Sequence, residues 1–555
     1  MERPLSEYPR PQLYRNSYLS LNGYWDYKIT KSGDIPTSFD KKILVPFSPE
    51  SQKSGVNHLL KPDEYLFYHL SFSLDKDFIK DKVLLHFTAV DQIAEVYINN
   101  HFLGKHIGGF LPFSFDIKPY LEKENHLVVK VQDFTDTSYH SRGKQRLKHG
   151  GIWYTPQSGI YMPVWLESVS LEYVEEVKFT PDIDKKEIVI NIKSKAKEAI
   201  IHIFNMDRPI DTNKDVHIKV KNMHLWSTED PYLYFVRITT REDEVNSYFA
   251  MRKFSIIKDE KGISRFALNN KPIFMKGVLD QGYYFDTLLT PPSYESYIKD
   301  IELVKSLGFN TIRKHIKIEI PRWYFECDKR GIIIWQDFVN GGNKYKLSTI
   351  TLPLITGIHK KDNKYKLFAR GDIEGRKEAI KEFKETINYL YNSPCIALWT
   401  IFNEGWGQFD SESILKELQE IDNTRIYDHA SGWHDQRIGN VKSMHVYFKK
   451  VKLPKKEDRC ISLSEYGGLV YKIKDHSMNG NHVYKAYKNK QDYLDAYQKM
   501  IDRDIVSNIP KGLSASIYTQ LSDVEEETNG FITFDREVVK ADPLLIKKIN
   551  DKIKL

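Results

Sequence analysis

The chain has 555 residues, of which 41% are hydrophobic, 28% are charged and 13% are aromatic. This composition is typical of a folded globular protein, and the length predicts three or four domains. The formal net charge of +7 is small for this length, and basic and acidic residues are interspersed, which argues against a nucleic-acid-binding protein. No segment has the unbroken run of about 18 apolar residues that a membrane helix needs.

Cysteine content and the first residues bear on cofactors and location. Cys327, Cys395 and Cys460 form neither a disulfide framework nor a zinc pattern, so we expect buried free thiols. We assign no cofactor and no metal ligand, and metal dependence stays open. The opening Met-Glu-Arg-Pro lacks the apolar core of a signal peptide. We therefore expect a cytoplasmic protein.

Residues 1–172 contain short apolar or alternating runs separated by Asn- and Gly-containing turns. This pattern predicts a jelly-roll β-sandwich, with strands at 83–87, 94–98 and 127–131. Residues 173–257 have the same character over about eighty positions, typical of a small immunoglobulin-like sandwich. The strands expected there are 188–192, 199–204, 217–220 and 232–239.

From residue 258 to 555, strand and helix signals alternate, which indicates a parallel sheet with crossover helices. Eight strands occur in order, the number that a (β/α)8 barrel requires. They are expected at 273–278, 309–313, 332–335, 396–402, 425–428, 444–447, 461–464 and 513–519. The polar stretch 341–372 is too long for a simple connection and predicts a lid or a substrate wall.

Catalytic groups of such barrels lie at the C-terminal ends of the strands. Glu404 and Glu465 end the fourth and seventh apolar runs, and each precedes glycines. Two carboxylates that face each other across the mouth fit a retaining glycosidase, which needs a protonated acid and an ionised nucleophile about 5–5.5 Å apart. We interpret the pair as catalytic.

The other candidates at strand ends are substrate-binding side chains. Arg313 can hold one carboxylate ionised. Asp337 fits either a substrate contact or a structural hydrogen bond, and His315 either a sugar contact or a loop histidine. Trp406 and Trp433 fit rim packing or sugar platforms, and the neighbouring glycines favour the platform. The set is completed by Asn403, His445 and Tyr447.

Several motifs stand in a recognisable order: Leu-Asn-Gly-Tyr-Trp at 21–25, Gly-Ile-Tyr-Met-Pro-Val-Trp-Leu-Glu at 159–167, Gly-Phe-Asn-Thr-Ile-Arg at 308–313, Asn-Glu at 403–404 and Ser-Glu-Tyr-Gly at 464–467. The set resembles glycoside hydrolase family 2, the family of β-galactosidases, β-glucuronidases and β-mannosidases, over nearly the whole chain. The resemblance implies that Glu404 is the general acid/base, that Glu465 is the nucleophile and that Asn403 binds the sugar 2-hydroxyl. It further implies that Tyr447 steers the nucleophile and that Arg313 and His315 line the terminal-sugar subsite.

Two departures from the family pattern bear on the substrate. Trp-Gln-Asp at 335–337 replaces the Trp-x-Glu that often follows strand three, so that contact is altered. After the eighth strand, the sequence Thr-Asn-Gly-Phe at 528–531 stands in place of the Asn-x-Lys pair that resembles a carboxylate-binding motif of β-glucuronidases. This difference argues against a glucuronide as the substrate. We therefore expect a retaining exo-β-glycosidase that acts on soluble β-galactosides.

Other readings stay open: a β-glucuronidase, a β-mannosidase, a transglycosylase, or an inactive carbohydrate-binding protein. A binder has no chemical need for two intact carboxylates, and fold alone decides nothing. The expected partner is a carbohydrate, and the resemblance suggests a homo-oligomer. We also expect the loop at 142–145 of the first region to reach the barrel mouth.

Overall fold

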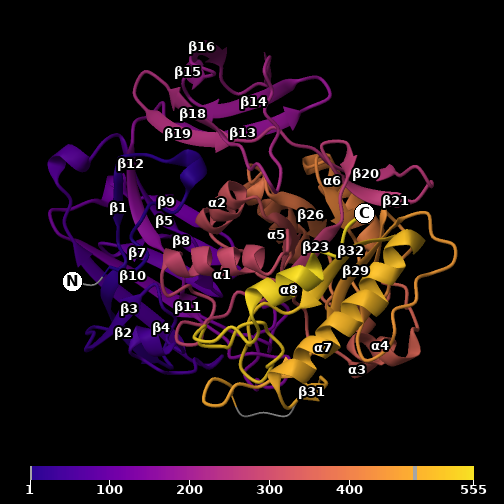
Figure 1. Cartoon of the computed structure of the whole chain (residues 1–555). Helices are drawn as coiled ribbons and strands as arrows, with labels where there is room; N and C mark the ends of the chain where they lie inside the picture. The colour runs from indigo at the N-terminus through magenta and orange to yellow at the C-terminus, as the bar shows by residue number, and fades with distance from the viewer. Residues whose placement is uncertain (1–2, 479–483) are drawn as a thin grey trace.

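The structure is a computed structural model that describes residues 3–478 and 484–555. Figure 1 shows two β regions, one at the N-terminal side and one above it, packed beside a barrel that the rest of the chain forms. Each of the three regions has its own hydrophobic core. None of the helices in the described residues is long and apolar enough to cross a membrane.

The N-terminal region is the expected antiparallel jelly roll. Its two main sheets have the strand orders β3-β2-β4-β10-β7-β8 and β1-β12-β5-β9. Side chains alternate along each strand, so that Leu127, Val129 and Val131 of β10 are buried in the core between the sheets. The strands are β1 (Tyr18–Ser20), β2 (Gly23–Thr30), β3 (Lys41–Val45), β4 (Tyr65–Phe72), β5 (Lys82–Phe87), β6 (Val90–Asp91), β7 (Ile93–Ile98), β8 (His101–Ile107), β9 (Phe113–Asp116), β10 (Asn125–Gln132), β11 (Gly159–Ile160) and β12 (Val164–Val169).

The second region is the expected immunoglobulin-like sandwich of a three-stranded and a four-stranded sheet, with orders β13-β14-β17 and β16-β15-β18-β19. Ile190, Ile201 and Ile238 fill the layer between the sheets and are fully buried. The strands are β13 (Val174–Asp182), β14 (Glu187–Ser194), β15 (Glu198–Ile203), β16 (Met206–Asp211), β17 (Val216–Lys219), β18 (Tyr234–Thr239) and β19 (Glu244–Phe249).

The third region confirms the eight-stranded barrel. Its strand order is β27-β26-β25-β24-β23-β32-β29-β28, and all of these neighbours pair in parallel. In the described chain, the sheet opens between β27 and β28. The barrel strands are β23 (Met275–Asp280), β24 (Thr311–Lys314), β25 (Ile333–Asp337), β26 (Ile396–Thr400), β27 (Ile426–Asp428), β28 (Val441–Val446), β29 (Cys460–Gly467) and β32 (Leu513–Thr519). A small sheet precedes them: β20 (Phe254–Lys258), β21 (Ser264–Leu268) and β22 (Lys271–Pro272); β30 (Val470–Tyr471) pairs with β31 (Ala486–Tyr487) beyond β29.

Helices cover most, but not all, of the outer face of the barrel. They are α1 (Tyr294–Ser306), α2 (Pro321–Arg330), α5 (Ile373–Leu390), α6 (Ser411–Ile421), α7 (Lys490–Met500) and α8 (Pro543–Asn550). The connections 429–440 and 447–459, which follow β27 and β28, are described throughout and contain no helix. The outer face of β28 is therefore not covered by a crossover helix of its own.

The segment 341–372 is folded rather than a plain loop. It contains α3 (Leu347–Ile350), α4 (Leu352–Thr356) and a short 3-10 turn at Tyr365–Phe368. The indole Nε1 of Trp433 donates to the Ile350 carbonyl at 3.2 Å, and His434 Nε2 lies 2.8 Å from the Thr349 carbonyl. The segment is therefore fixed as a wall beside the barrel mouth.

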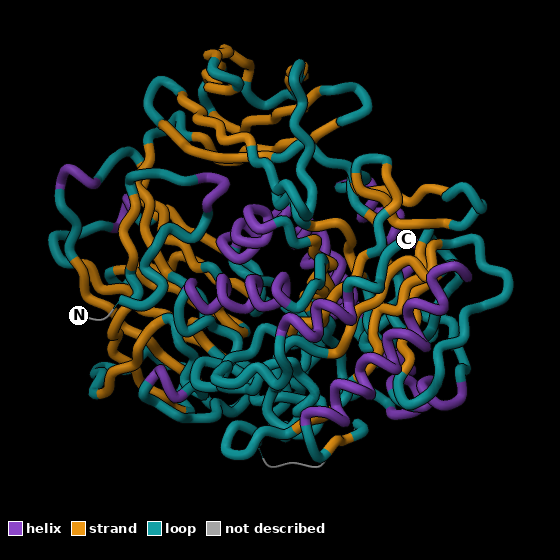
Figure 2. Tube along the Cα trace, viewed as in Figure 1, coloured by secondary structure: helices purple, strands orange, loops and turns teal. Residues whose placement is uncertain are grey.

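A loop of the jelly roll also reaches the mouth. The backbone N–H groups of Arg142 and Gly143 donate to the Asn340 carbonyl at 3.0 and 3.1 Å. Figure 2 shows a dense group of loops, drawn in teal, between the N-terminal strands and the barrel. The site at the mouth is consequently built from two regions of the chain.

Candidate active site

Glu404 and Glu465 meet at the mouth of the barrel. Glu404 follows β26, and its φ of +49° together with a 2.9 Å bond from its N–H to the Ser431 carbonyl fixes the turn that carries it. Glu465 lies in β29. One oxygen of each carboxylate lies within 4.8 Å of the other. This separation is close to that of retaining glycosidases, about 5–5.5 Å.

Glu465 is surrounded by donors. Arg313 Nη1 donates to its Oε1 at 3.0 Å, and the Tyr447 hydroxyl donates to its Oε2 at 2.6 Å. Burial raises the pKa of this carboxyl, but the charges of His445 and Arg313 outweigh burial and hold the pKa at about 2. Glu465 is therefore ionised at neutral pH.

Glu404 has the opposite environment. Burial, together with the negative charge of Glu465, raises its pKa above the ordinary value. Its Oε1 lies 3.0 Å from His445 Nδ1, a bond that only partly offsets these effects. Two carboxyls with pKa values displaced in opposite directions are the arrangement that an acid and a nucleophile require.

Arg313 is fully buried and links Glu465 to Asp337 and Asn403. Its Nε and Nη2 donate to the two oxygens of Asp337 at 3.0 and 2.9 Å, and Nη2 also donates to Asn403 Oδ1 at 2.8 Å. His315 Nδ1 lies 2.9 Å from Asp337, and burial lowers the His315 pKa to about 4. Both Asp337 oxygens are thus bonded to Arg313, and one of them also lies beside the His315 ring.

The two polar atoms of the Asn403 side chain have different environments. Its Oδ1 accepts from Arg313, whereas its buried Nδ2 has no hydrogen-bond partner among the described residues. An unpaired buried donor costs free energy unless a ligand takes it. Asn403 therefore offers a donor beside Glu404, as a sugar hydroxyl requires.

The two tryptophans lie at the rim. Trp406 is 2% exposed and packs against Trp153, with ring centroids 5.0 Å apart. Trp433 contacts His445 edge to face at 5.4 Å. Both are mostly buried by protein, and the platform role stays a prediction.

Two site residues, Tyr484 and Glu527, were not predicted, and a third, Lys144, lies in the loop at 142–145 that was expected to reach the mouth. Lys144, from the jelly roll, has its Nζ 3.4 Å from Glu527 Oε2 and 3.3 Å from the Tyr154 hydroxyl. The Tyr484 ring packs on Tyr447 with centroids 5.4 Å apart, and its hydroxyl lies 3.5 Å from Glu527 Oε1. The loop at 142–145 gave a signal for Lys144, but the acidic run at 525–527 is indistinguishable by sequence from a solvated loop.

Glu404, His445 and Glu465 also satisfy the distance requirement for a metal site. However, His445 uses opposite ring nitrogens, with Nδ1 toward Glu404 at 3.0 Å and Nε2 toward Glu465 at 3.5 Å. A histidine presents one nitrogen to one ion, and His445 Nε2 also lies 2.9 Å from the Ser431 hydroxyl, so the ring does not turn a single nitrogen toward both carboxylates.

Three family models match the chain. They are the glycosyl hydrolases family 2 sugar binding domain at residues 57–168, glycosyl hydrolases family 2 at 169–252, and the family 2 TIM barrel domain at 257–554. The last of these alone covers more than half of the chain.

Similar proteins carry several names. A β-galactosidase of Thermoanaerobacter pseudethanolicus is 25% identical over 437 residues, covering 73% of this chain and 53% of that protein. A putative β-glucuronidase of Formosa agariphila is 25% identical over 435 residues, covering 69% and 48%. The chain thus spans about half the length of these curated relatives.

Solved structures show the same fold from end to end. An uncultured Clostridium sp. β-glucuronidase superposes with a TM-score of 0.75 at 18% identity over 100% of both chains. A β-galacturonidase of Eisenbergiella tayi bound to galacturonate has a TM-score of 0.72 at 16% identity over 98% and 99%. Because the barrel model covers residues 257–554 and the other two family 2 models cover most of the remainder, the chain belongs to glycosyl hydrolases family 2.

Proposed function

We propose that this protein is a retaining exo-β-glycosidase that removes a terminal β-linked sugar. The observation that carries the proposal is the pair of close carboxylates, Glu404 and Glu465, whose pKa values are displaced in opposite directions. A carbohydrate-binding protein gains nothing from this electrostatic difference, whereas double displacement depends on it.

The proposed reaction is a double displacement in two steps. The Glu465 carboxylate attacks the anomeric carbon while Glu404 gives its proton to the departing glycosidic oxygen, so the C–O bond breaks and a glycosyl ester forms. Glu404, now ionised, takes a proton from water while the oxygen of that water bonds to the anomeric carbon; the ester bond to Glu465 breaks, Glu465 leaves as a carboxylate, and Glu404 is protonated again. Asn403 Nδ2 donates to a sugar hydroxyl next to the anomeric carbon.

We infer a neutral terminal sugar, most simply a β-galactoside. Among the described residues, the cations next to the carboxylates are compensated: Arg313 by Asp337 and Glu465, and Lys144 by Glu527. A uronate carboxylate would have to compete with these partners for a cation. The name of the Thermoanaerobacter relative supports the same choice.

A β-glucuronidase is the second candidate, and a specific observation favours it. Lys144 is buried, and although Glu527 compensates its charge, their contact of 3.4 Å is longer than the bonds of 2.9–3.0 Å that hold Arg313, so Lys144 is the cation that a uronate carboxylate can recruit more easily. The Formosa relative is named as a putative glucuronidase. Turnover of p-nitrophenyl β-glucuronide well above that of the galactoside would select this candidate.

The deciding experiment combines activity with covalent trapping. We expect the wild-type protein to hydrolyse one member of a panel of p-nitrophenyl β-glycosides and Glu404→Gln and Glu465→Gln to lose that activity. The matching 2-fluoro glycoside should add one sugar mass to the peptide that contains Glu465. A label on another peptide, or no turnover of any α- or β-glycoside, would refute the proposal.

A further inference from the structure

Two lysine-rich segments that are far apart in the sequence, residues 344–366 and 448–456, form one face of the protein. The first contains α3 and α4, which lie at the outer edge of the molecule, at the lower right of Figure 1, and the second follows β28. Lys449 Nζ lies 3.5 Å from the Leu354 carbonyl, and Lys450 lines the same cavity as Leu354. We call these two segments together the basic face.

The basic face carries more positive charge than the whole chain. It contains eleven lysines and one carboxylate, Asp362, which give a formal charge of +10, whereas the whole chain has +7, so that all other residues together carry −3. Asp362 is buried and accepts from the Ser411 N–H at 3.1 Å. None of the eleven lysines lies within 4.0 Å of a carboxylate oxygen of the described residues. The charge of this face is therefore uncompensated and attracts anions.

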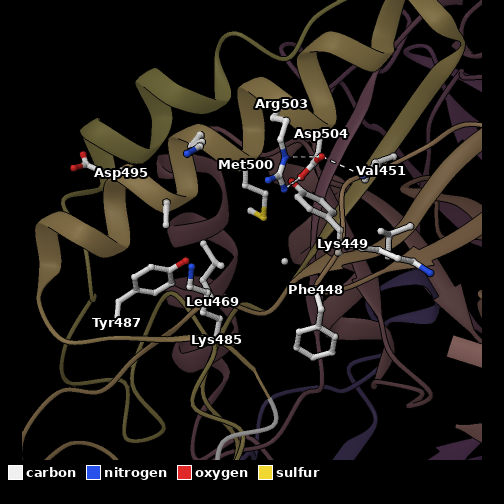
Figure 3. A pocket seen from close by; sticks show the side chains of 15 residues that line it. Phe448, Lys449, Val451, Leu469, Lys485, Tyr487, Asp495, Met500, Arg503 and Asp504 are labelled. Carbon is white, nitrogen blue, oxygen red and sulfur yellow. Dashed lines mark hydrogen bonds and ion pairs between the residues drawn. The ribbon is translucent and has the colours of Figure 1, made fainter. Parts of the chain in front are cut away.

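Apolar side chains stand among these lysines. The exposed large hydrophobic residues of the basic face are Leu347, Leu352, Ile355, Ile358 and Phe448. Ile355 is 78% exposed and Leu347 is 73% exposed. Figure 3 shows the Phe448 ring and the Lys449 side chain directed away from Arg503. Exposure of these apolar side chains to water costs free energy, which burial against a partner removes.

The combination of apolar side chains with lysines indicates which partner fits. Protein–protein interfaces are depleted in lysine. Nucleic acids are bound chiefly through their phosphates and base edges, with which exposed leucine and isoleucine side chains form no hydrogen bond. A bilayer with anionic lipids satisfies both kinds of side chain, because its headgroups attract lysines and its acyl layer accepts leucine and isoleucine.

We propose that the basic face binds the surface of a bilayer that contains anionic lipids. The exposed leucine and isoleucine side chains enter the interfacial layer, and the lysines lie at the level of the headgroups. The contact is peripheral, because α3 and α4 have four and five residues, far fewer than a membrane span needs. The inference does not depend on the glycosidase activity, since neither Glu404 nor Glu465 belongs to this face.

The test is co-sedimentation of the full-length protein with vesicles. One set of vesicles consists of phosphatidylcholine alone, and the other contains one quarter phosphatidylserine. We expect the partition coefficient at low salt to be at least about tenfold higher for the anionic vesicles and to decrease as salt screens the lysines. Equal partition into both kinds of vesicle, or no binding to the anionic ones, would overturn the inference.

A pair of apolar variants separates the basic face from general surface hydrophobicity. Ile355→Ser/Ile358→Ser should lower the partition coefficient for anionic vesicles at least about fivefold, because two side chains no longer leave water on binding. Leu171→Ser/Leu544→Ser is the matched control, since these leucines are 50% and 73% exposed and lie on other elements. The control should retain the binding of the wild type, and an equal loss in both variants would contradict the proposal.

A pair of charge variants addresses the lysines in the same way. The variant of the face is Lys346→Gln/Lys361→Gln/Lys450→Gln/Lys452→Gln. The control replaces four exposed lysines of the second region and of the turn between β20 and β21: Lys195→Gln/Lys197→Gln/Lys221→Gln/Lys261→Gln. The first should lower the partition coefficient at least about tenfold, and the second should change it little; circular dichroism shows whether each variant is folded. Equal losses in the two, or binding of a DNA oligonucleotide by a wild-type protein that does not bind vesicles, would overturn the inference, and the latter would assign the face to a nucleic acid.

Discussion

Tyr447→Phe tests how the protein keeps the nucleophile ionised. The substitution removes the hydroxyl that donates to Glu465 Oε2 at 2.6 Å and keeps the ring that packs against Tyr484. A hydrogen bond to a charged group contributes about 1.5–3 kcal/mol, and one pKa unit corresponds to about 1.4 kcal/mol. Loss of this bond should therefore raise the pKa of Glu465 from about 2 to roughly 3–4.

The higher pKa of Glu465 in Tyr447→Phe should reduce activity at acid pH. A nucleophile reacts only when it is ionised, and a higher pKa reduces its ionised fraction at acid pH. We expect wild-type kcat/KM to lose little activity down to about pH 3 and that of Tyr447→Phe to fall below about pH 4. At neutral pH the variant should also be slower by about tenfold or more, because the carboxylate is less well oriented.

The assay is steady-state hydrolysis from pH 3 to 8, with circular dichroism at each pH to show that the protein stays folded. Tyr484→Phe is the matched control, because its hydroxyl contacts Glu527 and not Glu465. The reasoning is refuted if the acid limb of Tyr447→Phe coincides with that of the wild type, or if the control shifts by the same amount.

Three further substitutions address the acid, the sugar subsite and stability. Glu404→Gln should lower kcat/KM for unactivated glycosides by roughly 10²–10⁴-fold and remove the basic limb of the pH profile, because the raised pKa of Glu404 sets that limb. Glu527→Gln should free Lys144 from its partner and raise the kcat/KM ratio of glucuronide to galactoside about tenfold. Lys540→Met leaves Asp523 unpaired in a fully buried pair 2.6 Å apart, which should lower the free energy of unfolding in urea by about 3–5 kcal/mol.

Each of these has a control. For Glu404→Gln, a 2,4-dinitrophenyl glycoside needs no acid catalysis and should keep most of its rate of glycosylation; equal losses on both substrates would contradict the assigned role. Glu526→Gln, whose carboxylate accepts from the Gly151 N–H, should leave the sugar ratio unchanged. Lys540→Met/Asp523→Leu should recover stability relative to Lys540→Met, and a further loss would contradict the explanation by an unpaired charge.

Strand existence was predictable because buried parallel strands are continuous apolar runs. All eight barrel strands are present, including the short one expected at 425–428, which is Ile426–Asp428. Boundaries were less predictable: β26 ends at Thr400, although Ile401 and Phe402 continue the apolar run, because these two residues pack after the chain has left the sheet. Segment 341–372 was expected to be a polar loop, but residues 347–356 within it are largely apolar and form the short helices α3 and α4.

The convergence of Glu404 and Glu465 was predictable because strand order fixes which ends meet at the barrel mouth. The contribution of Lys144 and Glu527 depends on a contact 383 residues apart in sequence, between the jelly roll and the last barrel loop. The periodicity of apolar residues along the chain cannot predict a contact between residues so far apart in sequence. Likewise, the chain predicts that Asp337 is near the site, but its use of both oxygens on Arg313 appears only in three dimensions.

Under the proposed function, the coupling between the two carboxylates also explains how Glu404 would change role during turnover. Part of the rise in its pKa comes from the negative charge of Glu465. When Glu465 becomes a glycosyl ester that charge disappears, while burial and the contact of Glu404 with His445 remain. The pKa of Glu404 must then fall, so the group that held a proton for the leaving oxygen becomes a carboxylate able to accept one from water. Esterification of Glu465 also removes one of the two carboxylates that neutralise Arg313. Because Arg313 stays paired with Asp337, its charge remains compensated in the buried site.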